Sequence, residues 1–393
     1  MLAFLVVAAV GCHSSDTSDS WSEALSRQLH RDTSMIKIDT GFCNFMRKYH
    51  VPAISVAAAK DDRVVYLKSF GLANLSDGIE ADNQSLFRII ESSMAVTSLA
   101  IKQLIAERRL NYNSKVFGNG GILGFQYGRK QYGPRITNLS IENLLKNQVD
   151  GWYGEDDMIA DVEFRQLFPS NDSALSWVLD HVPLKSARRD SSHFSEFDYF
   201  ILGRVIEKVS GMPYENYVKE NILRPAGITD MELGFDSANK PHEVSYYFPN
   251  PNSIRDFLRP RFNGEVHENL YLSRGDAALG WIASATDIVK LMIKYKTFES
   301  LNLNISVPRT TSLTDTAITK DGYNFDWFSS DSTSDWWESF QLLGSSTIMM
   351  RSPDGFCCAI LINTFRPGSL KFFPDVFQII KMAGSDSVIR QTQ

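Results

Sequence analysis

The stretch of residues 86–110 constrains the fold of this chain more than any other. It begins with an extended apolar segment, Leu86–Ile90, and continues as a helix pattern with a serine-rich start. Helical spacing gives one apolar face, made of Val96, Leu99, Ala100, Leu104 and Ile105. Free backbone amides and the positive end of the helix dipole favour an anion or a nucleophile near Glu91. The stretch therefore predicts a buried helix with a site at its N-terminal end.

The same stretch resembles a segment of a known enzyme family. Residues 86–101 are similar to the serine β-lactamase and penicillin-binding-protein-like hydrolases, in particular the class C, esterase and LACTB-like branch. That family has approximately Leu-Phe-Arg-Ile-Gly-Ser-Val-Ser-Lys at this point. In the family the serine is the nucleophile, and the lysine one helical turn later takes its proton. The resemblance implies a nucleophile position at residue 91 and a base position at residue 94.

This chain keeps the frame of that motif and lacks its chemistry. Glu91 stands at the serine position and Met94 at the lysine position. Ser92 and Ser93 do not restore the motif in another register, because Ala95 and Val96 follow them by three residues. The first motif is therefore predicted to be inactive.

The second and third family motifs are also altered at the positions that the resemblance assigns. The Tyr-x-Asn motif falls on Phe194-Ser195-Glu196, so the ring loses its hydroxyl and an amide becomes a carboxylate. The Lys- or His-x-Gly motif falls on Glu338-Ser339-Phe340, so an acidic residue replaces a basic one. Lysine to methionine and tyrosine to phenylalanine nearly conserve volume while they remove buried polar groups. We interpret the pattern as a retired active site in a stable fold.

New chemistry in the old site is the competing interpretation. Glu91, Glu196 and Glu338 would converge on one pocket if the family geometry holds. Such carboxylates can swing apart into water, which we favour, or bind a cation or an amine. We expect no cofactor and assign no metal ligands.

Other candidate pocket residues lie beside these positions. Ser92 and Ser93 lie at the helix start without a lysine partner. His193 is a possible proton carrier, although a surface histidine is the favoured interpretation. Trp336 and Trp337 precede Glu338 and could line a binding cleft, with core packing as the favoured role for at least one of them.

The fold expectation follows from the resemblance and agrees with the hydrophobic pattern. Landmarks similar to the family follow in order over residues 35–385, among them Leu202–Tyr214, Leu223–Met231 and Gly280–Ile288. We expect an α/β fold of the β-lactamase/transpeptidase-like type, with an antiparallel sheet flanked by helices and a mostly helical second lobe. Residues 34–110 and 271–393 are predicted to form the α/β lobe, and residues 111–270 the helical lobe.

The N-terminal region has the composition of a secretory leader. Residues 1–12 include an apolar run too short to span a bilayer and are predicted to be a signal sequence, followed by a polar linker over residues 13–33. A bacterial lipoprotein cleavage box at Ala9–Cys12, with a lipid-anchored periplasmic or cell-surface protein, is the alternative. Five Asn-x-Ser sequons suit a eukaryotic secretory route. These glycosylation candidates are Asn74, Asn83, Asn138, Asn171 and Asn304.

The remaining cysteines, Cys43, Cys357 and Cys358, show no metal-ligand spacing. Buried small apolar side chains are the favoured interpretation, and a bridge from Cys43 to one of the adjacent pair is the alternative.

Composition narrows the function classes. The chain has 393 residues, 43% hydrophobic and 22% charged, with a formal charge of −6. This balance gives no case for nucleic acid as a partner, and no membrane span is expected. The favoured function is a secreted, catalytically inactive protein of this fold that binds a small-molecule or protein ligand through the former cleft. The alternative is an esterase, amidase or peptidase that works with non-standard residues.

Overall fold

The computed structural model describes residues 17–31, 35–146, 149, 169–182, 184, 196–234, 240–247, 275–295, 336–342, 344–364 and 371–385. Within this part of the chain a six-stranded antiparallel sheet is the central layer, in the order β3-β2-β1-β9-β8-β7. Its strands are β1 (Ala53–Lys60), β2 (Arg63–Asn74), β3 (Ile79–Glu80), β7 (Trp336–Leu342), β8 (Ser345–Arg351) and β9 (Phe356–Ile362). The N-terminal hairpin thus pairs with the C-terminal strands, and the expected antiparallel sheet is confirmed.

The two ends of the chain meet in the middle of this sheet. Ala57 in β1 pairs with Leu67 in β2 on one side and with Ala359 in β9 on the other. The β1–β2 turn has positive φ at both central residues, 47° at Asp61 and 67° at Asp62. Aspartate tolerates this region better than most residues, and a two-residue hairpin of this type needs it twice. The two aspartates therefore suit this turn.

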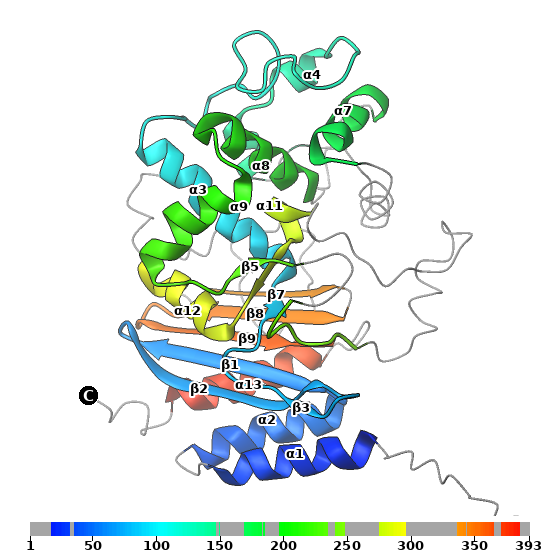
Figure 1. Ribbon diagram of the computed structural model, residues 1–393. Helices are drawn as coiled ribbons and strands as arrows, with labels where there is room; N and C mark the ends of the chain where they lie inside the picture. The colour runs from blue at the N-terminus through cyan, green and yellow to red at the C-terminus, as the bar shows by residue number, and fades with distance from the viewer. Residues whose placement is uncertain are drawn as a thin grey trace, which may run out of the picture.

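Three helices cover one face of the sheet. They are α1 (Thr17–Arg31), α2 (Ile36–Tyr49) and α13 (Phe372–Ser385), and Figure 1 shows α1 and α2 below the strands and α13 behind β1 and β2. Phe42 and Met46 of α2 share an apolar cluster with Ile54, Ile360 and Val376. The opposite face of β1 and β9 packs against α12 (Ala285–Lys294).

Helix α1 corrects one expectation. The predicted polar linker over residues 13–33 contains this 15-residue helix, and its residues Ala24 and Leu25 are fully buried. Gln28 makes two hydrogen bonds to the backbone of Gly71 in β2, donating to its carbonyl (3.2 Å) and accepting from its amide (2.6 Å). Trp21 donates from its indole N–H to the Pro52 carbonyl at 2.9 Å. The overall composition of this segment is polar, but it contains four apolar side chains at helical spacing. They are Trp21, Ala24, Leu25 and Leu29.

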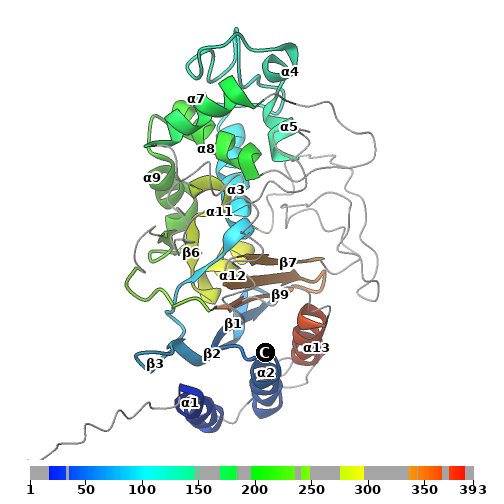
Figure 2. The same cartoon turned by 90° about the vertical axis from the view of Figure 1, so that its right-hand side faces the viewer.

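The second layer is mostly helical and stands on the other side of the sheet (Figure 2). Its elements are α3 (Ser93–Ala106), α4 (Pro134–Thr137), α5 (Ile141–Leu145), α7 (Asn171–His181), α8 (Glu196–Ser210), α9 (Tyr214–Val218), η2 (Lys219–Leu223), η3 (Arg224–Ala226) and α11 (Asp276–Leu279). Helices α3, α8 and α11 pack on one another. Helix α3 was expected in the α/β lobe, but it packs with the helical lobe because its residues are buried nearly all round.

A small sheet joins the layers, in the order β4-β6-β5. Its strands are β4 (Phe87–Arg88), β5 (Glu232–Leu233) and β6 (Trp281–Ala283). Phe87 pairs with Ala283 and Arg88 with Ile282, so β4 leads directly into the start of α3. The fold class is confirmed: a mixed α/β fold whose antiparallel sheet is flanked by helices.

The three cysteines of the described region are free and buried. Cys43 and Cys358 lie in the cluster under α2, whereas Cys357 faces the opposite cluster. Burial raises the pKa of the Cys43 thiol to about 11, so it stays protonated near neutral pH. The favoured interpretation of buried small side chains is confirmed, and the alternative bridge is not formed.

None of the helices in the described ranges is both long and apolar enough to cross a bilayer.

Candidate functional site

The start of helix α3 is held on both sides by neighbouring strands. A 3₁₀ turn, η1 (Ile90–Ser92), connects β4 to α3. Ile89 donates its amide to the Trp281 carbonyl at 3.1 Å, and Ser345 donates its hydroxyl to the Arg88 carbonyl at 2.7 Å. Strands β7 and β8 pack against η1. The predicted site therefore lies where the sheet edge, the small sheet and α3 meet.

Ile90 has an unusual backbone at this junction. Its φ is +45°, in the left-handed region, although its side chain is β-branched. The related family segment has glycine at this position, and glycine adopts positive φ without steric cost. The isoleucine side chain is only 2% exposed. Position 90 thus keeps the positive φ that suits the glycine of the related segment, although the residue is isoleucine.

Glu91, at the nucleophile position, is buried, with 7% of its surface exposed. It precedes the first turn of α3, where the positive end of the dipole stabilises a carboxylate. A carboxylate there can accept hydrogen bonds or pair with a cation. It cannot replace a serine hydroxyl as an activated nucleophile without a partner that manages protons.

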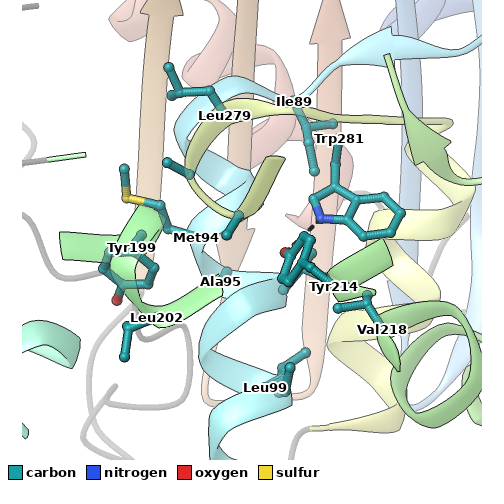
Figure 3. Close-up of a cluster of buried hydrophobic side chains, with 14 of the residues drawn as sticks. Ile89, Met94, Ala95, Leu99, Tyr199, Leu202, Tyr214, Val218, Leu279 and Trp281 are labelled. Atoms are coloured by element: carbon teal, nitrogen blue, oxygen red, sulfur yellow. Dashed lines mark hydrogen bonds between the residues drawn. The ribbon is translucent and has the colours of Figure 1, made fainter. Parts of the chain in front are cut away.

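Met94, at the base position, is fully buried in an apolar cluster. Figure 3 shows its thioether beside Tyr199 and Leu202 of α8, above Ala95 and Leu99 of its own helix. The Tyr199 hydroxyl donates to the Leu145 carbonyl (3.0 Å) and lies 3.1 Å from the Ser98 hydroxyl. Through these hydrogen bonds the Tyr199 hydroxyl links α8 to α3 and α5. An ammonium group would find an apolar environment at position 94.

The two serines at the helix start differ in their contacts. The Ser93 hydroxyl accepts a hydrogen bond from the Trp281 amide at 3.2 Å. The Ser92 hydroxyl is buried, with the residue 1% exposed, and bonds to no described residue. Lys102 is nine residues beyond Ser93, about 13.5 Å along a helix at 1.5 Å per residue. It is too far away to serve as the base of either serine.

A buried hydrogen-bond network supports the first turns of α3. The Tyr214 hydroxyl lies 2.6 Å from Thr97 Oγ1 and accepts from the Trp281 indole N–H at 2.9 Å. Thr97 in turn donates to the Ala277 carbonyl at 2.6 Å. Burial raises the pKa of Tyr214, so its hydroxyl keeps its proton. No spacing in the sequence indicates this network, although Trp281 and Tyr214 both lie in segments that resemble the family, Gly280–Ile288 and Leu202–Tyr214.

The first turn of α8 contributes two buried acidic residues. Glu196 is 3% exposed and Asp198 is fully buried. Helix α8, with Glu196, and the turn η1, with Glu91, both pack on α3. Among the described residues no group of three His, Cys, Asp or Glu side chains is arranged to hold a metal ion. The side chain of Glu338 lies outside that set, and the three-carboxylate pocket stays a prediction.

A buried ion-pair network fixes α8 to α11. Arg204, 1% exposed, contacts Asp276 Oδ2 through Nη2 at 2.5 Å and Glu207 Oε2 through Nε at 2.7 Å. Asp276 also accepts from the amides of Asn171 (3.1 Å) and Ala277 (2.5 Å). This network holds α7, α8 and α11 together behind the site.

Several predicted residues fall outside the described part of the chain. These are His193, Phe194 and Asn304. Trp336, Trp337 and Glu338 belong to β7, where Glu338 pairs with Met349 of β8, and their side chains are not described. Because β7 packs against η1, the strand predicted for the third motif does border the site.

The four sequons of the described region differ in accessibility. Asn83 and Asn138 are exposed. Asn74 donates from Nδ2 to Asp77 at 2.8 Å, and Asn171 donates from Nδ2 to the buried Asp276. Of these four sequons, Asn171 is the one whose side-chain amide is hydrogen-bonded to a buried carboxylate.

The family profile described as Beta-lactamase matches residues 38–373, which is most of the chain. The chain belongs to the β-lactamase family. The altered residues at positions 91 and 94 therefore lie within a family member.

Curated relatives are similar over a shorter range. A protein of Escherichia coli strain K12 described as "Putative D-alanyl-D-alanine carboxypeptidase" is 25% identical over 264 residues, 61% of this chain and 59% of the relative. A Salmonella gallinarum protein of the same description is 27% identical over 52% of this chain and 46% of its own length. The matches therefore span about half of the length of these relatives.

Solved structures confirm the fold. The octameric penicillin-binding protein homologue of Pyrococcus abyssi superposes with a TM-score of 0.64 at 18% identity, covering 89% of this chain and 77% of that one. A class C β-lactamase mutant gives 0.63 at 14% identity, covering 90% and 99%. The penicillin-binding protein of Bacillus halodurans gives 0.61 at 18%, covering 86% and 98%.

Proposed function

We propose that this chain is a pseudoenzyme of the β-lactamase family that binds a ligand or a partner through the former active-site region. The observation that carries the proposal is the pair of replacements on the first turn of α3. Glu91 removes the nucleophile, and Met94 replaces the base with an apolar side chain in a fully buried apolar cluster. Methionine packs in such a place at little cost, whereas a lysine would need a buried partner.

The buried carboxylates supply the chemistry for binding. Glu91 and Glu196 are both less than one tenth exposed, and both η1 and α8, which carry them, pack on α3. A buried carboxylate is stabilised by hydrogen bonds or by a cation, so these side chains suit recognition of a ligand amine or cation. The appearance of carboxylates at these two positions, together with the replacement of the base by Met94, favours recognition over turnover.

Covalent labelling tests the proposal. The purified protein is treated with a fluorophosphonate probe, in parallel with a penicillin, and its intact mass is measured beside an active member of the family. We expect no adduct on this chain under conditions that label the active enzyme completely. A stoichiometric adduct that is lost in Ser92→Ala or Ser93→Ala contradicts the proposal.

A hydrolase with non-standard residues is the second candidate. The description of the curated relatives as carboxypeptidases and the buried Ser92 hydroxyl favour it. Ser93 is the weaker nucleophile of the two because its oxygen accepts from the Trp281 amide. This candidate requires a general base near Ser92, and the labelling experiment distinguishes it directly.

We further propose that the chain is secreted and glycosylated. The apolar run in residues 1–12 and the exposed sequons at Asn83 and Asn138 support this route. N-terminal sequencing of the protein exported by a eukaryotic host tests the leader. We expect a mature N-terminus beyond residue 12.

A further inference from the structure

Exposed positive charge is concentrated at one end of a chain that is acidic overall. Between residues 108 and 141 the sequence has six basic residues and no Asp or Glu, while the whole chain has a formal charge of −6. All six basic side chains are exposed. They form the distal basic face: Arg108, Arg109, Lys115, Arg129, Lys130 and Arg135.

Tertiary contacts bring these residues to one end of the helical lobe. Arg109 donates to the Val209 carbonyl at the C-terminal end of α8, and Lys208 on the same turn donates to Gln126 at 3.0 Å. The amides of Arg129 and Lys130 donate to the Asp180 carboxylate on α7 at 2.7 and 2.8 Å. Figures 1 and 2 show α4 and α7 at the end of the molecule opposite to α1 and α2. The face is therefore far from the candidate site.

Few carboxylates pair with these basic side chains in the described part of the chain. Lys115 and Arg135 donate to the carbonyls of Asn138 (2.9 Å) and Leu184 (3.2 Å), which leaves their net charge in place. Of the six, only Arg109 has a carboxylate within ion-pair distance among the described residues, Glu107 at 3.6 Å. The Asp180 carboxylate, which accepts from the amides of Arg129 and Lys130, offsets part of the charge of those two residues. Several basic residues elsewhere do pair with carboxylates, for example Lys68 with Asp39 (2.6 Å) and Lys219 with Glu215 (2.6 Å).

Two exposed aromatic rings lie among these charges. Phe125 is 63% exposed and stacks on Tyr132, with ring centroids 5.4 Å apart. Trp177 on α7 is 40% exposed and stacks on His181 at 4.8 Å. They are the only large exposed apolar side chains of the helical lobe in the described ranges. Two rings are too little apolar area for the core of a standard protein interface, but each offers a flat face to a ring-shaped ligand.

We propose that the distal basic face binds an acidic polysaccharide. A polyuronate presents carboxylates at intervals along a linear chain of rings, which suits separated basic residues with exposed aromatic faces between them. A nucleic acid carries its negative charges more densely than a polyuronate does, so the overall charge of −6 repels a nucleic acid more strongly, and the small apolar area disfavours a protein. The proposal does not depend on what the former active site does.

Affinity measurements with charge-reversed variants test this proposal. The test variant combines Arg129→Glu with Lys130→Glu, which leaves the backbone bonds to Asp180 available. The control variant combines Lys37→Glu with Arg63→Glu, two exposed residues in the α/β lobe. Both variants change the net charge by the same amount. Sodium alginate is the probe, neutral dextran is the uncharged control, and equal unfolding midpoints verify the fold.

We expect the wild-type chain to bind alginate at low salt and not dextran, with an affinity that falls as salt rises. The test variant should bind more than about tenfold more weakly, because each basic residue near an anionic surface contributes appreciably. The control variant should stay within about twofold of wild type. The proposal is overturned by no alginate binding, by equal losses in both variants, by equal binding of dextran, or by tighter binding of poly-L-glutamate or oligodeoxythymidylate.

Discussion

Removal of the Asp276 carboxylate should destabilise this protein far more than removal of a surface partner. In the native structure Asp276 pairs with Arg204 at 2.5 Å, and Arg204 is 1% exposed. In Asp276→Ala the guanidinium keeps only Glu207, whose side chain is 35% exposed. Breaking a buried pair on one side costs about 3–5 kcal/mol, since the remaining charge stays buried without compensation. Asp276→Asn keeps the volume and an acceptor, so its cost should be smaller.

The surface pair between Arg224 and Glu220 provides the matched control. Its side chains are 70% and 44% exposed, so Glu220→Ala should cost about 0–1 kcal/mol. Urea unfolding followed by tryptophan fluorescence measures both, because Trp281 is fully buried and hydrogen-bonded beside α11. Equal losses in Asp276→Ala and Glu220→Ala would refute the assignment of Arg204 and Asp276 as the clamp between α8 and α11.

Three further predictions follow from particular contacts. Gln28→Ala removes both bonds to Gly71, and limited proteolysis should then release α1 sooner than in wild type; unchanged cleavage would show that apolar packing alone docks the helix. Burial raises the pKa of Glu243, so the folded state retains a proton that the unfolded state loses. Stability should fall as pH rises from about 4.5 to that raised pKa, and Glu243→Gln should flatten this part of a pH series of unfolding free energies. In a eukaryotic secretion host, Asn138→Gln should lose one glycan by mass, whereas Asn171→Gln should lose none, because the Asn171 amide is bonded to the buried Asp276.

The sequence predicted the sheet because its signals are local and strong. The landmarks Leu202–Tyr214, Leu223–Met231 and Gly280–Ile288 follow in the order of the family, and the fold that they imply contains this antiparallel sheet. Helix α1 could not be recognised from composition, since only four apolar side chains fix it and the strongest contacts are the two bonds from Gln28 to Gly71. A hydrophobic pattern in the sequence does not show which part of the fold a helix will pack against.

The candidate site was predictable in position and less so in content. Glu91 and Met94 lie where the motif placed them, at the start of α3. Tyr199, which shares the apolar cluster of Met94, lies about a hundred residues away in sequence, and no spacing rule connects the two. The second motif remains a prediction at Phe194, and the third at Glu338, with only the strand β7 placed beside η1.

The backbone at Ile90 shows how the turn before α3 keeps its conformation without the glycine of the related family segment. Positive φ at a non-glycine residue costs about 1–3 kcal/mol, while burial of an isoleucine side chain gains about 1.5–3 kcal/mol. These two terms nearly cancel, so loss of the glycine leaves stability almost unchanged. The conformation is also imposed from both sides, by the Ile89 bond to Trp281 and by the Ser345 bond to Arg88. Because packing and strand contacts hold the turn in place, its conformation does not depend on a glycine at position 90.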